Sequence, residues 1–143
     1  MLNISGIHEG YVLDHIRAGM SLQIYHDLKL DQSGYTIAII MNAPSKKMGA
    51  KDIIKVECPL GGIDLDILGY IDHNITVNVI RQDEIVEKHT LRLPRQVKNV
   101  IRCKNPRCIT SIEQGLDQIF LLTDEEQQVY RCKYCEEKYH RNV

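Results

Sequence analysis

The chain has 143 residues and a formal net charge of -1, and 43% of its residues are hydrophobic and 26% charged. This balance is that of an ordinary globular protein, so it excludes a disordered chain and gives no global attraction to nucleic acid or anionic membranes. No apolar run approaches the roughly 18 residues of a membrane span, and the N-terminus lacks a basic region followed by an apolar stretch. We therefore expect a cytoplasmic protein of one compact domain or two small ones.

The first elements in the chain are a strand, a helix and a second strand. Closely spaced apolar residues predict a strand over 11–16, and apolar residues that recur every four positions predict an amphipathic helix over 21–30, with Ser21 available as its N-cap. Residues 35–41 are nearly all apolar and rich in β-branched side chains. This run predicts a central strand that is buried on both faces.

The pattern then repeats after a loop over 42–49. We predict a strand over 52–57, a short helix that begins near Ile63, and strands over 74–80 and 84–91 that pair as a hairpin. The order β-α-β-β-α-β, with one added strand, is the ferredoxin-like pattern, in which two helices cover one face of an antiparallel sheet. The fold class is therefore α+β.

A domain boundary is expected near Pro94, where the periodic pattern ends. Residues 1–94 carry nine Lys and Arg against twelve Asp and Glu, whereas residues 95–143 carry nine against seven. The second part is thus mildly basic, and it consists of short strands separated by cysteine turns. We expect two domains, 1–94 and 95–143, the second a small all-β metal-binding domain of the rubredoxin or zinc-ribbon kind.

Four cysteines in the second domain follow the pattern C-x4-C-x23-C-x2-C, formed by Cys103, Cys108, Cys132 and Cys135. Zinc prefers four soft donors in a tetrahedron, and a short loop between two cysteines lets both sulfurs reach one ion. A complete shell of four thiolates leaves no position for water or substrate. The spacing therefore predicts one structural Zn2+ per chain, without which this small domain would unfold.

Other interpretations of the cysteines remain open at this point. Two disulfides or a redox-active C-x-x-C are possible in principle, although the chain shows no export signal and no thioredoxin-like pattern. His140 could replace a thiolate, but we expect it to be a surface residue. Five cations flank the ligands and would offset the -2 charge of a zinc tetrathiolate: Arg102, Lys104, Arg107, Arg131 and Lys133.

Polar residues in the first domain allow two interpretations. Asp14 and His15 end the first predicted strand, while Lys55 and Lys88 lie in later strands. Lysines on neighbouring strands can bind a phosphate as point charges, which would indicate an anionic small ligand. Alternatively, the lysines are solvent-facing positions and the histidine is a satisfied one. The sequence contains no phosphate-binding glycine motif, and Cys58 has no identifiable base partner.

Five separated segments resemble the aspartate carbamoyltransferase regulatory chain in order and spacing: VLDHIRAG (12–19), PSKKMGAKDIIKVE (44–57), TVNVI (76–80), LPRQVKNVIRCKNPRCI (93–109) and YRCKYCEEKY (130–139). The resemblance implies a non-catalytic subunit, with an N-terminal allosteric domain that binds CTP or ATP and a C-terminal zinc domain that docks on catalytic chains. It also implies a regulatory dimer, feedback control of pyrimidine biosynthesis, and no nucleic-acid or membrane partner.

The resemblance also implies site residues. Lys88 and His15 would face the triphosphate, Asp14 and Lys55 the ribose and base, and Asn78 would contribute a hydrogen bond. The apolar wall of this site would comprise Ile7, Val12, Ile80 and Ile85.

Two positions depart from the family pattern, and two others match its interface with the catalytic chain. Asp83 stands where better-known members carry an aromatic residue near the base, so the base preference is open. Asn105 and Glu136 match positions that face the catalytic chain, while Arg107 replaces a small amide there.

Two other classes of protein compete with this interpretation. A zinc-ribbon nucleic-acid binder would account for the basic second domain and for its tyrosines Tyr130, Tyr134 and Tyr139, and it would bind DNA or RNA in a salt-dependent way. A zinc-dependent hydrolase would require an open coordination site and a general base.

Overall fold

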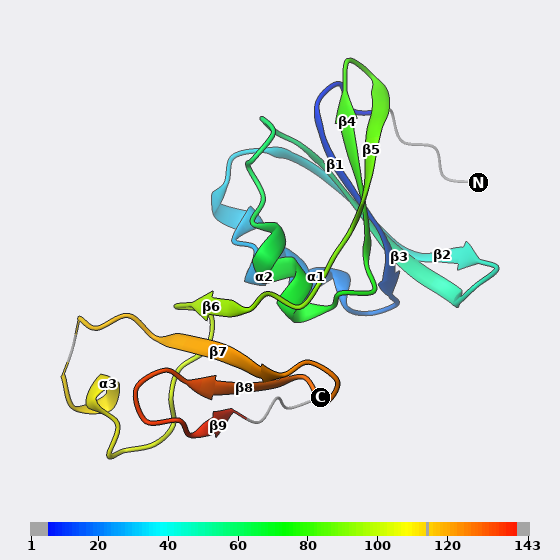
Figure 1. Cartoon of the computed structure of the whole chain (residues 1–143). Helices are drawn as coiled ribbons and strands as arrows, with labels where there is room; N and C mark the ends of the chain where they lie inside the picture. The colour runs from blue at the N-terminus through cyan, green and yellow to red at the C-terminus, as the bar shows by residue number, and fades with distance from the viewer. Residues whose placement is uncertain (1–5, 114, 140–143) are drawn as a thin grey trace. The chain divides into compact units, whose positions relative to one another are not determined.

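The computed structural model describes residues 6–113 and 115–139 (Figure 1). The chain divides into two compact units, which we call the N-terminal unit (residues 1–92) and the C-terminal unit (residues 93–143). Each unit is described by itself. Among the described residues, no helix is long and apolar enough to cross a membrane.

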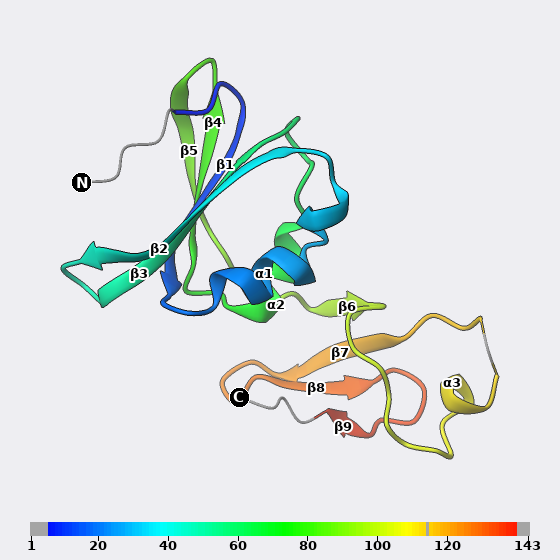
Figure 2. The ribbon, with the colours of Figure 1, turned by 180° about the vertical axis from the view of Figure 1, so that it is seen from behind.

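The N-terminal unit contains a five-stranded antiparallel sheet in the order β2-β3-β1-β4-β5. Figures 1 and 2 show its two α-helices on the same side of this sheet. The first four strands and the two helices have the predicted ferredoxin-like order, and β5 is the added strand, so the predicted fold is confirmed. The elements are β1 (Gly10–Arg17), α1 (Ser21–Asp27), the 3-10 helix η1 (Leu30–Gln32), β2 (Thr36–Ser45), β3 (Gly49–Glu57), α2 (Leu65–Ile71), β4 (Thr76–Arg81) and β5 (Glu84–Thr90).

The core of this unit lies between the sheet and the two helices. Leu13, Ile54 and Val77 come from the three middle strands, and Ile24 and Leu68 come from the helices; all five are almost completely buried. Because side chains alternate along a strand, the residues next to these in sequence lie on the opposite face of the sheet. Among the described residues of the N-terminal unit no helix covers that second face, which we call the open face.

Two β-bulges interrupt the sheet near β3. The register between β1 and β3 shifts between Leu13 and Ile16, and the register between β2 and β3 shifts between Ile40 and Ala43. His15 and Asn42, one in each bulge, adopt left-handed backbone conformations with φ of 60°. Such a conformation is uncommon for residues other than glycine and is found at turns, bulges and functional sites.

The expectation that residues 35–41 form a central, doubly buried strand is wrong. β2 is an edge strand, and its residues are half-buried or exposed, with Met41 47% exposed. It also continues through Pro44 to Ser45, so the predicted loop is largely part of a long hairpin with β3. Proline is tolerated there because an edge strand has a side that needs no ladder hydrogen bonds.

The first helix is shorter than predicted, and Ser21 is not its N-cap. Met20 is the N-cap and makes no side-chain cap hydrogen bond, and Ser21 is the first helical residue. The helix ends at Asp27 because Lys29 turns the backbone into the left-handed region with φ of 56°. In α2, by contrast, the Asp64 side chain caps the helix by accepting hydrogen bonds from two backbone N–H groups.

The C-terminal unit is a four-stranded antiparallel sheet in the order β6-β7-β8-β9. Its small core contains Phe120 and Tyr130, and the Tyr130 hydroxyl donates a hydrogen bond of 2.6 Å to the carbonyl of Pro94. One short helix, which the sequence analysis did not predict, follows Cys108. The elements are β6 (Gln96–Lys98), α3 (Ile109–Ile112), β7 (Ile119–Asp124), β8 (Val129–Cys132) and β9 (Lys138–Tyr139).

Candidate metal centre and nucleotide site

The four predicted cysteine ligands meet at one point of the C-terminal unit. Cys103 and Cys108 flank the turn before α3, Cys132 ends β8, and Cys135 lies in the following turn. Their four sulfur atoms lie within 4.8 Å of one another, with 3.6 Å between Cys103 and Cys135 and 3.7 Å between Cys108 and Cys132. A tetrahedral zinc with Zn–S bonds of about 2.3 Å requires about 3.8 Å between sulfurs. The geometry therefore fits a tetrathiolate metal site.

These distances also exclude the disulfide interpretation. A disulfide requires about 2.05 Å between sulfurs, whereas all five cysteines of the chain are free thiols. Cys58 lies in the N-terminal unit, where burial and then the Glu9 carboxylate raise the pKa of its thiol. His140 lies outside the described residues.

The protonation of the four thiols shows why they need a cation. Burial raises the pKa of Cys108, but hydrogen bonds from the hydroxyl and backbone N–H of Thr110 and from neighbouring sulfurs lower it to about 7. At Cys103, burial and the neighbouring sulfurs outweigh the backbone N–H of Asn105 and raise the pKa to about 12. Four thiolates held this close together repel one another, and a bound cation offsets that repulsion.

Two polar residues, one just after β6 and one just before β7, hold in place the first knuckle, which is the turn that contains Cys103 and Cys108. The buried Gln118 side chain accepts a hydrogen bond of 2.9 Å from the Cys103 backbone N–H. Asn99, which has φ of 58°, exchanges backbone and side-chain hydrogen bonds of 2.7 and 2.8 Å with Gln118. Neither residue could be predicted from the sequence, because an amide far from the cysteine motif carries no spacing signal.

The cations that flank the cysteines are all exposed, and so they surround the site without entering it. Lys104 lies over the Tyr139 ring at 5.7 Å, and the Arg131 guanidinium donates a hydrogen bond of 3.1 Å to the backbone carbonyl of Glu136. Asn105 is half-buried, and its carbonyl accepts hydrogen bonds from the Cys108 backbone N–H and the Ser111 hydroxyl. Asn105 thus lies in the first knuckle, and Glu136 lies in the second knuckle, which is the turn that contains Cys132 and Cys135.

Four residues of the predicted nucleotide site form one row across the N-terminal sheet. Val12 of β1 pairs with Lys55 of β3 on one side and with Asn78 of β4 on the other, and Asn78 pairs in turn with Lys88 of β5. Val12, Lys55 and Asn78 are each next in sequence to core residues, and Lys88 pairs directly with Asn78. Since side chains alternate along a strand, the row lies on the open face. Lys88 is exposed, while the other three are half-buried.

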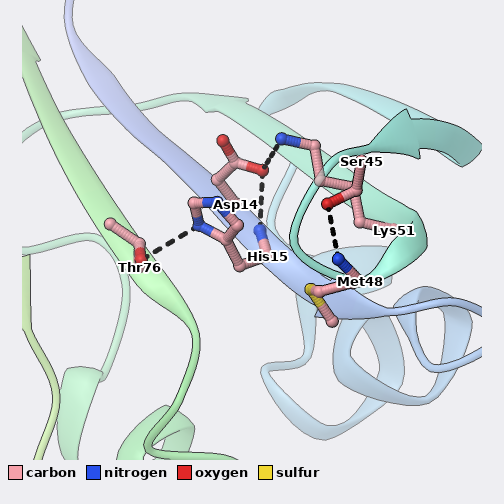
Figure 3. A network of polar contacts seen from close by, with 6 residues as sticks. All are labelled: Asp14, His15, Ser45, Met48, Lys51 and Thr76. Carbon is pink, nitrogen blue, oxygen red and sulfur yellow. Dashed lines mark hydrogen bonds and ion pairs between the residues drawn. The ribbon is translucent and has the colours of Figure 1, made fainter.

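Asp14 and His15 lie beside this row, in the bulge of β1 (Figure 3). Asp14 forms an ion pair of 2.9 Å with Lys51 and accepts a hydrogen bond of 2.6 Å from the His15 backbone N–H. Nδ1 of His15 is 3.1 Å from the Thr76 hydroxyl. Burial raises the pKa of Asp14, but Lys51 and the His15 N–H together hold it below its usual value.

Lys51 was not among the predicted site residues. It lies four positions before Lys55 on the same strand, and an even spacing places two residues on the same face of a sheet. That spacing was a signal in the sequence. The partner could not be found in the same way, because the bulge in β1 decides which carboxylate Lys51 meets.

Of the four residues predicted to form the apolar wall, Ile80 and Ile85 lie next to each other. Ile80 is buried and pairs across the hairpin with Ile85, whose side chain is 55% exposed. Ile7 is half-buried and precedes His8, whose Nδ1 lies 3.2 Å from the Asp83 carboxylate. Asp83 is thus part of the polar end of this hairpin.

An α+β unit with an open sheet face, followed by a β unit built around four thiols, defines a two-domain metal-binding protein. The family model of the aspartate carbamoyltransferase regulatory chain allosteric domain matches residues 2–92, and that of its metal-binding domain matches residues 95–143. The chain belongs to the aspartate carbamoyltransferase regulatory chain family.

Relatives named as aspartate carbamoyltransferase regulatory chains cover almost the whole protein. The one from Clostridium botulinum is 52% identical over 97% of this chain and 94% of its own length. The relative from Clostridium tetani is 49% identical over 97% and 96%, and that from Bifidobacterium longum is 44% identical over 96% and 98%. The chain is therefore a regulatory, non-catalytic subunit with an allosteric and a metal-binding domain.

Proposed function

We propose that this chain binds nucleoside triphosphates on the open face of its N-terminal sheet and transmits their effect, through a zinc-bound C-terminal domain, to catalytic chains of aspartate carbamoyltransferase. The observation that supports the proposal is that one chain contains two different sites. Residues 1–94 carry a row of cationic and amide side chains, and residues 95–143 carry a cluster of four cysteines. CTP and ATP are the effectors that the family resemblance implies, in feedback control of pyrimidine synthesis in the cytoplasm.

The nucleotide site requires complementary roles from its residues. Lys88 and His15 face the triphosphate, because a cation and a ring N–H are phosphate ligands. Asp14 and Lys55 face the ribose and base. Oδ1 of Asn78 is buried and makes no hydrogen bond within the described residues, and a buried acceptor without a partner is expected to receive one from a ligand. Ile7, Val12, Ile80 and Ile85 form the apolar wall.

Zinc is the metal that best fits the C-terminal cluster. Four thiolates in a tetrahedron suit a borderline-soft ion without redox chemistry, and the closed shell makes a single structural ion per chain. Asn105 and Glu136 stand on the two cysteine knuckles, where they would meet the catalytic chain. Loss of the ion would therefore remove the docking surface together with the fold that presents it.

A second copy of the chain is the other proposed partner. The half-exposed apolar residues of β2 lie on an edge strand, whose free backbone groups can pair with another strand. A regulatory dimer through β2 and its neighbouring helices would cover them. A nucleotide bound in this assembly changes catalysis only by binding the quaternary states of the enzyme with different affinities.

Reconstitution tests the proposed function. The zinc-loaded chain is mixed with its cognate catalytic subunit, and sedimentation and aspartate saturation are measured with and without ATP or CTP. A larger assembly whose saturation curve shifts with nucleotide is expected. The proposal fails if no larger assembly forms, or if the assembly ignores both nucleotides.

A further inference from the structure

Asp52 is a buried carboxylate in the middle of β3, with no exposed surface. It accepts three backbone hydrogen bonds: Oδ2 from Gly19 N–H at 3.1 Å and Ser21 N–H at 3.3 Å, and Oδ1 from Asn42 N–H at 3.0 Å. Burial raises its pKa, but the contacts from Ser21 and the N–H groups of Asn42 and Gly19 lower it below the usual value. A charge is tolerated in such a place only when it is fully hydrogen-bonded.

The three N–H groups are those that the fold leaves without ladder or helix partners. The bulge in β2 removes Asn42 from the register with β3. The turn after β1 contains Gly19, and α1 begins at Ser21 without a side-chain cap. One carboxylate therefore completes the hydrogen bonding of three segments: the turn after β1, the start of α1 and the bulge of the edge strand.

The open face carries a different network at the same place. Lys51 directly precedes Asp52, so the two side chains leave β3 on opposite faces. Lys51 forms its ion pair with Asp14 in the bulge of β1, where His15 has its left-handed backbone and contacts Thr76 (Figure 3). Both bulges thus flank the Lys51–Asp52 pair, one on each side of β3.

We propose that Asp52 is a positioning residue of the nucleotide site: from the buried face it holds the bulge of β2 and the turn that follows β1. In this way it keeps Asp14, His15 and Lys51 in place on the open face and links them to edge strand β2. The inference rests on the proposed function, since it assigns a role within that site. Without the carboxylate, three backbone N–H groups lose their acceptor, and the loss is costly at the buried Ser21 unless the backbone rearranges. The turn after β1 and the bulge of β2 would then shift, and the site residues with them.

The test compares Asp52→Ala and Asp52→Asn with Leu68→Ala in the zinc-loaded full chain. Leu68 lies in the same core on α2, and its truncation destabilises the unit without touching either bulge. Affinities for ATP and CTP are measured by calorimetry, and unfolding temperatures by circular dichroism. Asp52→Ala is expected to raise both dissociation constants about two- to thirtyfold, the range for residues that couple sites indirectly. Asp52→Asn keeps one carbonyl acceptor and should show a smaller rise, whereas Leu68→Ala should leave both constants within about twofold.

A spectroscopic measurement separates positioning from general loss of stability. In nitrogen-15 spectra without nucleotide, the backbone signals of His15 and Asn42 should move in the Asp52 variants and stay in place in Leu68→Ala. If Asp52→Ala does not fold, Asp52→Asn alone must show the weaker binding and the moved signals.

The outcomes are distinct from those of the proposed function. If the wild-type chain binds neither nucleotide, the proposed function fails and this inference falls with it. If the wild-type chain binds but the Asp52 variants bind equally well, or lose affinity only in proportion to their unfolding temperature as Leu68→Ala does, the positioning role alone is overturned.

Discussion

The N-terminal and C-terminal units achieve a folded core by different means. In the N-terminal unit, fourteen buried apolar or cysteine side chains form one core cluster among the described residues. The C-terminal unit has about half as many residues, and its buried side chains are few, with Cys108 and Cys132 among them. Because small domains bury too little apolar surface to be stable alone, we expect the second unit to depend on a bound metal. The two units should therefore fail under different treatments.

The sharpest test of this difference is Cys108→Ser. It removes a buried ligand and with it most of the folding free energy from zinc, which is of order 10 kcal/mol in small zinc domains. We expect the C-terminal unit to lose its metal and unfold while the N-terminal unit stays folded. Bound zinc measured by a chelating dye, together with near-ultraviolet circular dichroism of the tyrosines, checks both statements.

Cys58→Ser is the matched control, because Cys58 is also buried but lies in the N-terminal unit. It should retain a full equivalent of zinc and lower only the stability of its own unit. Normal zinc content in Cys108→Ser would contradict the expectation that the C-terminal unit depends on a metal held by Cys108.

The next largest effect is expected from Ile54→Ala in the N-terminal unit. Ile54 is fully buried in the centre of the sheet, and truncation of such a side chain typically costs 2–5 kcal/mol. Denaturant unfolding should show this loss in the N-terminal transition, with no release of zinc. Leu22→Ala, at a position that is 51% exposed on α1, should change stability by less than about 0.5 kcal/mol. Zinc release by Ile54→Ala would mean that the two units fold as one.

Lys88→Ala should separate ligand binding from both kinds of stability. Lys88 is exposed at the end of the row on the open face, so its loss should not disturb folding. A hydrogen bond to a charged group contributes about 1.5–3 kcal/mol, which predicts ATP and CTP binding weaker by roughly 10- to 150-fold. Calorimetric titration gives the affinities, and sedimentation with the catalytic subunit should be unchanged.

Lys47→Ala provides the matched control, since Lys47 is an exposed lysine in the β2–β3 turn. Equal nucleotide affinities in wild type and Lys88→Ala would remove Lys88 from the proposed site.

The same difference between the units decides what the sequence could predict. Cysteine spacing indicates a metal site directly, because the ligands must come in short loops, and the four cysteines do lie together in the structure. The strand and helix order of the first unit also followed from apolar periodicity. The position of β2 did not, because an apolar run looks the same whether it is covered by its own chain or left half-exposed at an edge. Pro44 was the available sign of an edge strand.

The networks around the sites could not be predicted for a related reason. Lys51 meets Asp14, and Asp52 meets Asn42, only because two bulges shift the register of neighbouring strands. A bulge depends on tertiary hydrogen bonding more than on local residue preference. Ser21 was a reasonable N-cap by type, but it is the first helical residue, and its own backbone N–H donates to the carboxylate of Asp52 on a distant strand.

The smallest expected effect concerns acid and the Asp14–Lys51 pair, whose side chains are 22% and 17% exposed. The folded pKa of Asp14 is lowered, so its contribution to stability is complete above the unfolded value of 3.8 and is lost as the pH falls through the lower folded value. In Asp14→Asn without nucleotide, this part of the acid dependence of the N-terminal unit should disappear, with a stability loss near neutral pH of about 1 kcal/mol, the upper value for partly hydrated ion pairs.

Lys51→Met and the double variant complete a mutant cycle that isolates the Asp14–Lys51 pair. A coupling energy of zero, or an unchanged acid transition in Asp14→Asn, would show that the pair does not stabilise the bulge. The C-terminal unit is expected to respond to acid through competition of protons with its proposed zinc for the thiolates, so the two transitions can be followed separately by zinc release and by sheet ellipticity.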